Sequence, residues 1–437
     1  MKKLIDYIDD NVLVKVTSLQ SISVITRIIA GILTSKAIAV FIGPVGLALI
    51  GNLQNFVSAF QTISVAGLYK GTVKYINAYK NSVTQLSKAV SSVFYVGFFT
   101  TVLVSFFCYF NADLINNLIF PSYNNYAFVI KVFAIVLPFY ALNMFSFSIM
   151  NGFSKYKILI VINIIGQILS MSVALLLIYL NAIKGALISV VIAESLIFLI
   201  TLVGIINRRS LVPLIKIQSI SIPFIKKLSP HALMALFSAV LLPIVAIAIR
   251  MHIMENVGYK DAGFWEAMTR ISKYYLMIVT SLIALYILPR FSEINDVKEF
   301  RKEVFDFYKM IIPVLLIGFV FIYIFKGVLV QVILSEEFQP VEDLFLWQLF
   351  GDFLKVLASV IAYQFLAKKM FWHYILTEAF LLLTLYTTSI YFVNMFDSAN
   401  GAVIAHFVTY VMYYGIILLI FGSSLFGVDG DNEVNRE

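Results

Sequence analysis

Charged side chains inside long apolar segments are the residues of this chain whose types and spacing could do chemistry. In segment 263–289, Glu266, Arg270 and Lys273 stand at positions i, i+4 and i+7, so on a helix they share one face. Glu266 can neutralise part of the charge of Arg270, and the surplus positive charge favours an anionic ligand. A charge at the centre of a membrane helix costs roughly 2.5–3.5 kcal/mol, so such residues normally face a bundle interior or a wet cavity.

Other polar residues extend this pattern. In segment 18–41, Arg27 belongs to a stripe with Gln20, Ser23, Gly31 and Thr34 at helical spacing,. These residues have alternatives to lining a cavity. Lysines and arginines near segment ends can extend to the membrane interface instead, and neutral polar residues can form hydrogen bonds between helices. The candidate substrate-binding residues are Arg27, Lys36, Arg250, Arg270, Lys273, Gln54 and Asn55.

Three carboxylates are candidates for ion coupling: Glu194, Glu266 and Asp352. Glu194 has no basic residue within one turn of segment 185–206, which makes it a candidate for proton coupling, with a neutral hydrogen-bonded side chain as the alternative. Asp352 stands three residues before Lys355, and we expect these two to pair with each other. Proton and sodium are the candidate coupling ions, and no cofactor is expected.

Other chemistry has little support. Cys108 is the single cysteine, and His231, His252, His373 and His406 lie far apart without metal-ligand spacing,. The chain has no glycine-rich phosphate loop and no nucleophile–base spacing. We therefore expect no catalytic residues and no metal site, and a protein that is not an enzyme.

The composition indicates the elements that position these residues. The 437 residues are 61% hydrophobic and 13% charged, with a mean hydropathy of +0.94. These values exclude soluble globular, disordered and fibrous proteins. Stretches of about 20 apolar residues predict membrane-spanning helices. Twelve are expected, at 18–41, 45–68, 89–110, 125–149, 158–180, 185–206, 231–254, 263–289, 310–333, 343–367, 374–394 and 401–421.

The distribution of basic residues predicts the orientation. Alternate connections, counted from the N-terminus, hold 22 of the 32 lysines and arginines, whereas the other connections hold only Lys184 and Lys260. The positive-inside rule places the N- and C-termini in the cytoplasm. Positive charge thus reflects topology, and no nucleic-acid partner is expected.

The chain divides into two similar parts, which predicts two pseudo-symmetric six-helix lobes. These are an N-terminal lobe, 1–206, a basic cytoplasmic linker, 207–230, a C-terminal lobe, 231–422, and a cytoplasmic tail, 423–437. In both lobes a cation precedes a glycine turn, with Lys36 seven residues before Gly43 and Arg250 eight residues before Gly258. This similarity favours parallel repeats, although any long membrane protein can be cut in half.

Several motifs resemble those of one transporter family. The helix 1–2 signature of Wzx-type O-antigen flippases resembles residues 38–56, which contain Gly43-Pro44, and the end of their helix 2 resembles residues 66–75. Their helix 8 signature resembles residues 258–292, which contain Pro289-Arg290. These flippases form the polysaccharide transporter family of the multidrug/oligosaccharidyl-lipid/polysaccharide exporter superfamily. The resemblance implies two lobes arranged as a V with a cationic central cavity. It also implies a flippase that moves an undecaprenyl-diphosphate-linked oligosaccharide, the O-antigen repeat unit, across the bacterial inner membrane by alternating access.

Expected partners are the lipid-linked oligosaccharide and membrane lipids, with a polysaccharide polymerase and a chain-length regulator as candidate protein partners. The alternative function is a multidrug or metabolite/cation antiporter of the same fold. That alternative predicts dominant cavity carboxylates, and the surplus of arginine and lysine argues against it. A polysaccharide polymerase or ligase would need a large external loop, which the spacing of the segments does not provide. Twelve segments also argue against the lipid II flippases, which usually carry additional helices.

Overall fold

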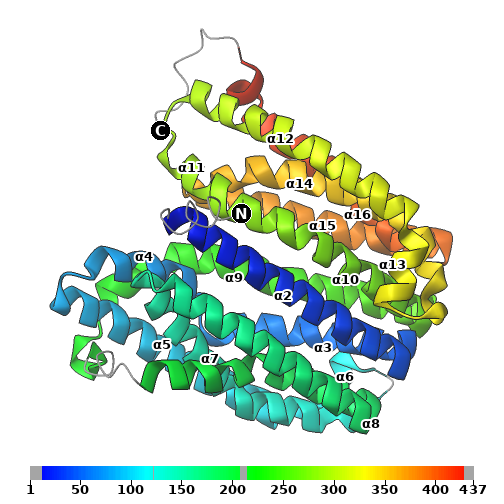
Figure 1. Cartoon of the computed structure of the whole chain (residues 1–437), viewed down its shortest axis with the longest axis horizontal. Coiled ribbons are helices and arrows are strands. Elements are labelled where there is room, and N and C mark those ends of the chain that lie inside the picture. Colours follow the sequence, from blue (N-terminus) through cyan, green and yellow to red (C-terminus); the bar gives the residue numbers. More distant parts are fainter. Residues whose placement is uncertain (1–11, 122, 207–213, 428–437) are drawn as a thin grey trace, which may run out of the picture. The chain divides into compact units, whose positions relative to one another are not determined.

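The computed structural model describes residues 12–121, 123–206 and 214–427, and throughout these residues the regular structure is helical (Figure 1). Within the described residues, ten helices are long and apolar enough to cross a membrane. One of them, Tyr156–Gly204, covers two of the predicted spans. A further predicted span, 45–68, corresponds to the helix α3 (Gly43–Ser64). The all-helical membrane fold predicted from the hydrophobic segments is therefore confirmed.

The long helix α8 (Tyr156–Ile206) reverses direction at Asn181 and Ala182, whose backbone is not helical. The Ser170 hydroxyl donates to the carbonyl oxygen of Ala193 at 2.8 Å, so the two arms lie side by side. Ala182 has a φ of 44°, in the left-handed region that a residue with a Cβ rarely occupies. The reversal accounts for the two spans that the sequence predicts here.

The chain forms two compact units, residues 1–247 and residues 248–437. In the N-terminal unit, α2 (Val12–Phe41) packs against α8, and α7 (Ala127–Gly152) packs against both α8 and α5 (Val83–Phe110). The shorter helices α4 (Tyr69–Tyr79), α6 (Ala112–Ile119) and the 3-10 turn η1 (Asn124–Tyr126) connect these spans.

The division between the units falls within α9 (Ile222–Asn256), which begins inside the predicted linker. After a short 3-10 turn, η3 (Ile217–Ser219), α9 starts with Pro223 in its first turn, where a missing N–H is tolerated,. Phe224 and Leu228 are buried in a cluster with Tyr75 of α4. Residues 222–230 of the predicted linker are therefore helical, because these apolar side chains pack against the N-terminal unit. Residues 207–213 of the predicted linker lie outside the described residues.

The C-terminal unit continues with α10 (Tyr259–Leu282), a π-helical segment η4 (Ile283–Ile287), α11 (Leu288–Glu293), and α12 (Val297–Ile324). The short helices α13 (Lys326–Ile333) and η5 (Glu336–Leu344) precede α14 (Phe345–Ala367), α15 (Phe371–Phe396) and α16 (Asn400–Phe426). Residues 423–426, expected in the tail, therefore complete α16, and residues 428–437 lie outside the described residues.

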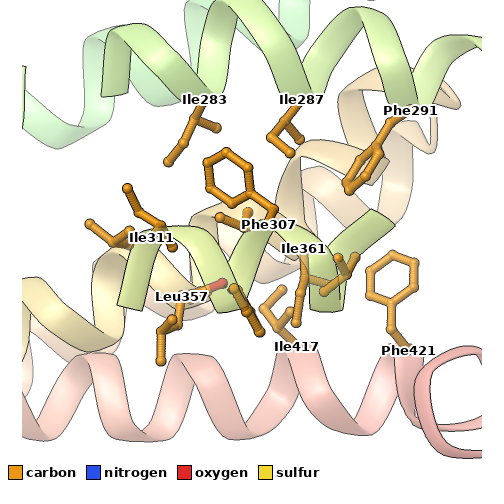
Figure 2. Packing of buried hydrophobic residues seen from close by; sticks show 14 of the residues in the cluster. Ile283, Ile287, Phe291, Phe307, Ile311, Leu357, Ile361, Ile417 and Phe421 are labelled. Atoms are coloured by element: carbon orange, nitrogen blue, oxygen red, sulfur yellow. Dashed lines mark hydrogen bonds between the residues drawn. The ribbon is translucent and has the colours of Figure 1, made fainter. Parts of the chain in front are cut away.

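The apolar core of the C-terminal unit joins α10, η4, α11, α12, α14 and α16. Figure 2 shows Ile287, Phe307, Ile361 and Ile417 converging from four of these elements. In the candidate span that contains α14, 61% of an 18-residue apolar stretch is buried, a larger share than in any other candidate span of the described residues. A charged residue on the buried face of α14 therefore needs hydrogen-bond or ion-pair partners.

The glycine turns of the predicted repeat share an unusual backbone. Gly43 opens α3 with a φ of 78°, and Gly258 precedes α10 with a φ of 137°. Glycine adopts these values at little cost, whereas other residues are strained. In each unit such a glycine begins the helix after the one that carries Lys36 or Arg250.

Candidate functional site

A buried ion cluster of three residues, which we call the arginine–glutamate triad, joins α9 to α10. Glu266 Oε1 accepts a hydrogen bond from Arg270 Nε at 2.8 Å. Its other oxygen, Oε2, accepts one from Arg250 Nη2 at 2.5 Å. The side chains of Arg250, Glu266 and Arg270 are 1%, 2% and 8% exposed. One carboxylate thus serves two guanidinium groups, and the triad carries a net positive charge.

The sequence analysis anticipates only part of this arrangement. The i, i+4 spacing predicts the pairing of Glu266 with Arg270, and the structure contains it. Arg250 does not snorkel to the interface. It is buried in the triad, with its guanidinium carbon 5.2 Å from the centroid of the Trp265 ring. The reason is that the packing of α9 on α10 brings it to the second oxygen of Glu266.

Lys273 completes the charged stripe of α10. Its side chain is exposed, and its ammonium group is electrostatically coupled to Glu266, Arg270, Arg250 and Lys355. Together with the triad, Lys273 makes three cations against one carboxylate. This stripe of the C-terminal unit can therefore attract an anion, and Lys273 is its accessible member.

A second polar cluster surrounds the fully buried Asp352 of α14. Asp352 Oδ2 accepts hydrogen bonds from Ser272 Oγ and Tyr275 Oη, both at 2.5 Å, and from Gln348 Nε2 at 3.2 Å. Its Oδ1 lies 3.0 Å from His406 Nε2. We call Asp352 and these four partners the Asp352 cluster, which joins α10, α14 and α16.

The expected pairing of Asp352 with Lys355 is wrong. Asp352 interacts with His406 instead, and Lys355 Nζ lies 5.7 Å from the centroid of the Tyr410 ring. The physical reason is burial: α14 packs against α10 and α16, and these helices bring Ser272, Tyr275 and His406 to Asp352.

In the N-terminal unit, Arg27 and Glu194 influence each other. Both side chains are exposed, and the guanidinium of Arg27 is electrostatically coupled to the carboxyl of Glu194. The sequence places no basic residue near Glu194 along its own helix, and the packing of α2 on α8 supplies one. The proton-coupling role of Glu194 stays a prediction.

The remaining candidates of the N-terminal unit lie on α2 and α3. Lys36 and Asn55 are half-buried and Gln54 is exposed. The nearby Asn52 is fully buried and donates to the carbonyl oxygen of Ile119 at 3.0 Å, so it holds α3 against the end of α6. At least one polar residue of α3 therefore serves to join helices. Gln54 and Asn55 have the same alternative to substrate binding.

Comparison with known proteins identifies the family. Residues 37–343 match the sequence pattern of the family described as "Polysaccharide biosynthesis protein". The chain belongs to the polysaccharide biosynthesis protein family. The resemblance to Wzx-type flippases, inferred from the motifs above, is thereby confirmed.

Relatives of this polysaccharide biosynthesis protein are transporters. The chain is 27% identical over 405 residues to a protein named lipid III flippase from Escherichia coli (strain K12), covering 91% of this chain and 95% of the relative. A lipid III flippase from Shigella flexneri matches to the same extent. These relatives support the expectation of a transporter rather than an enzyme.

Solved structures share the fold. An inward-facing MATE-family multidrug resistance transporter of the MOP superfamily superposes with a TM-score of 0.74 at 12% identity, covering 92% of this chain and 95% of that chain. The lipid II flippase MurJ, in an inward closed conformation, superposes with a TM-score of 0.69 at 15% identity, covering 94% of this chain and 87% of that chain. These likenesses confirm the membrane-transporter fold.

Sequence reasoning missed His406, Ser272 and Tyr275 as members of a polar cluster. His406 was assessed only for metal-ligand spacing, and the structure places it beside a carboxylate. Its position within an apolar segment, 401–421, was the available signal, since an ionisable residue there needs a partner. Among residues 12–121, 123–206 and 214–427, no group of three or more His, Cys, Asp or Glu side chains could hold a metal ion.

Proposed function

We propose that this polysaccharide biosynthesis protein is a flippase for an undecaprenyl-diphosphate-linked oligosaccharide, of which the O-antigen repeat unit is one example. The diphosphate and the glycan both resist entry into hydrocarbon. A protein that moves such a lipid must therefore offer cations to the diphosphate, where charge-assisted hydrogen bonds are strongest.

The observation that carries this proposal is the surplus charge on α10. Arg250 and Arg270 share a single carboxylate, and Lys273 stands accessible on the same stripe. Lys273 would contact the diphosphate, and the buried triad would add positive potential behind it. In the N-terminal unit, Arg27, Lys36, Gln54 and Asn55 remain proposed substrate contacts. The whole-length similarity to lipid III flippases supports the same class of cargo.

The proposal also covers the membrane in which the protein lies and the source of energy for transport. The protein would lie in the bacterial inner membrane with both termini in the cytoplasm, as the lysine and arginine distribution indicates,. Alternating access would move the cargo outward, coupled to an ion gradient through one of the buried carboxylates. A polysaccharide polymerase and a chain-length regulator would take up the product.

The test is complementation of a strain from which the gene is deleted, with membrane levels of each variant verified. Lys273→Ala should abolish or greatly reduce surface polysaccharide, and Lys273→Arg should retain it. Lys131→Ala is the matched control, because Lys131 is also an exposed lysine of a membrane helix, α7, and is not proposed to bind substrate.

Two results would contradict the proposal. One is normal surface polysaccharide with Lys273→Ala at normal protein levels. The other is unchanged polysaccharide on deletion of the gene together with lost resistance to cationic drugs, which would favour the antiporter alternative.

A further inference from the structure

The Asp352 cluster contains an aspartate–histidine pair whose geometry suits proton binding. Asp352 is fully buried, whereas the side chain of His406 is 15% exposed. An ionised carboxylate can only accept hydrogen bonds, so His406 Nε2 is the donor across the 3.0 Å contact,. The other ring nitrogen, Nδ1, is then the one that can accept a proton.

The surroundings of Asp352 favour a proton over a sodium ion. Ser272, Tyr275 and Gln348 all direct hydrogen-bond donors at Oδ2, and His406 directs one at Oδ1. A metal cation would need oxygen lone pairs directed at it. Here both carboxylate oxygens are engaged by donors, and an imidazolium at His406 would still retain its hydrogen bond to Asp352.

Gly351 makes the pair sterically feasible. A Cβ added at this position of α14 would overlap Cδ2 of the His406 ring and would lie 3.1 Å from its Nε2 and 3.2 Å from the Cα of Phe407. The imidazole therefore reaches Asp352 only because residue 351 has no side chain. This provides a way to separate the two groups without replacing either of them.

Several helices that pack against α14 and α16 carry further charged or titratable groups. Tyr275 of α10 and Tyr410 of α16 flank it, with the Tyr410 ring centroid 4.8 Å from that of His406. Lys355 of α14 is electrostatically coupled to Asp352 and to Lys273 of α10. Glu378 of α15 is coupled to Tyr410, and Tyr308 of α12 is engaged with a backbone carbonyl.

We propose that Asp352 and His406 form a proton-binding site of the C-terminal unit. A proton from water binds His406 Nδ1, converts the imidazole to an imidazolium, and returns to water on release, while the Asp352 carboxylate stabilises the charged ring. Lys273 directly follows Ser272, whose hydroxyl donates to Asp352, so the added positive charge lies close to Lys273. Proton binding and anion binding are therefore linked, and this linkage must be reciprocal. The link to Lys273 rests on the proposed function, whereas the proton site does not.

The experiment is a pH titration of the histidine imidazoles by NMR. Full-length protein labelled with 15N-histidine would be placed in lipid nanodiscs without substrate and titrated between pH 5 and 9. The His406 signal is assigned by its loss in His406→Gln. In the unsubstituted protein it should titrate. In Asp352→Asn and Gly351→Ala the pH dependence of this signal should change, because the ring loses its carboxylate partner,.

His252 provides the internal control, because its Nε2 lies 2.7 Å from the neutral amide oxygen of Asn394 rather than a carboxylate. Its midpoint should be the same in all variants, which also reports correct folding. Failure of His406 to titrate, or an unchanged midpoint in Asp352→Asn with His252 unaffected, would overturn the proton site.

The proton-site proposal and the flippase proposal can be refuted independently. The titration uses no substrate, so its failure leaves the flippase proposal intact. Conversely, a titrating His406 in a protein that moves no lipid-linked glycan would contradict the flippase proposal alone. The linkage adds one further expectation: binding of undecaprenyl diphosphate should shift the His406 midpoint, and it should not do so in Lys273→Ala.

Discussion

Arg250, close to the end of α9, donates to Glu266 of α10 across 2.5 Å, and both side chains are almost completely buried. Because Arg270 uses the other oxygen of the same carboxylate, this contact leaves a positive charge inside the C-terminal unit. The accessible Lys273 stands on the same stripe. The contact therefore links helix packing to the proposed recognition of an anionic lipid headgroup.

Replacing Glu266 should destabilise the protein strongly. Glu266→Gln would remove the carboxylate charge that Arg250 and Arg270 share, and breaking a buried ion pair on one side costs about 3–5 kcal/mol. Thermal unfolding of the purified protein in detergent would measure this. Glu255→Gln, at an exposed position of α9, is the control and should change the free energy of unfolding by less than about 0.5 kcal/mol. Equal stability of the two variants would show that the triad is not a structural ion cluster.

Lys273 should matter for binding and not for folding. Its side chain is exposed, so Lys273→Ala should change the free energy of unfolding by less than about 0.5 kcal/mol while transport is lost. Measuring unfolding and transport on the same preparation separates the two effects. A parallel loss of stability and transport would instead assign Lys273 a structural role.

The hydrogen bond from Tyr275 to Asp352 should be worth more than a neutral one. Tyr275→Phe removes a donor to a buried carboxylate and should cost about 1.5–3 kcal/mol. Tyr308→Phe removes a hydrogen bond to the carbonyl oxygen of Leu357, 2.7 Å away, and should cost about 0.5–1.5 kcal/mol. Unfolding measurements on the two variants compare them directly, and a smaller loss for Tyr275→Phe would argue against an ionised Asp352.

Two glycines of the N-terminal unit should respond to alanine in opposite ways. Gly67 has a φ of 62°, and a Cβ there would lie 2.7 Å from the carbonyl oxygen of Ala232. Gly67→Ala should therefore destabilise the protein by at least about 1–2 kcal/mol. In α5, Gly97 has open space around it, so Gly97→Ala should be neutral or stabilising by up to about 1 kcal/mol. Similar unfolding temperatures for both variants would contradict the close contact between Gly67 and α9.

Local patterns along the chain predicted the spans and one ion pair. Apolar length is enough to recognise a membrane helix, and spacing of four residues is enough to pair Glu266 with Arg270. The reversal within α8 was equally predictable, because the apolar stretch from 158 to 206 is too long for a single span.

Contacts between helices could not be read in this way. Arg250 and Glu266 stand 16 residues apart, and Asp352 and His406 stand 54 apart, so only helix packing determines that they meet. Arg27 and Glu194 are likewise brought under mutual influence by the packing of α2 on α8. A polar residue in a buried helix needs a partner, and the sequence shows that need without showing which helix meets it.

The most direct test of a cationic headgroup site is equilibrium binding of two lipids that share the undecaprenyl chain, one with a diphosphate headgroup and one without. Undecaprenyl diphosphate and uncharged undecaprenol would be titrated against the protein in nanodiscs. The diphosphate should bind at least about tenfold more tightly, since one charge-assisted hydrogen bond is worth about 1.5–3 kcal/mol. Lys273→Ala should remove this preference, and Lys131→Ala should leave it unchanged. Equal affinities for the two lipids, or a preference that survives Lys273→Ala, would contradict the account.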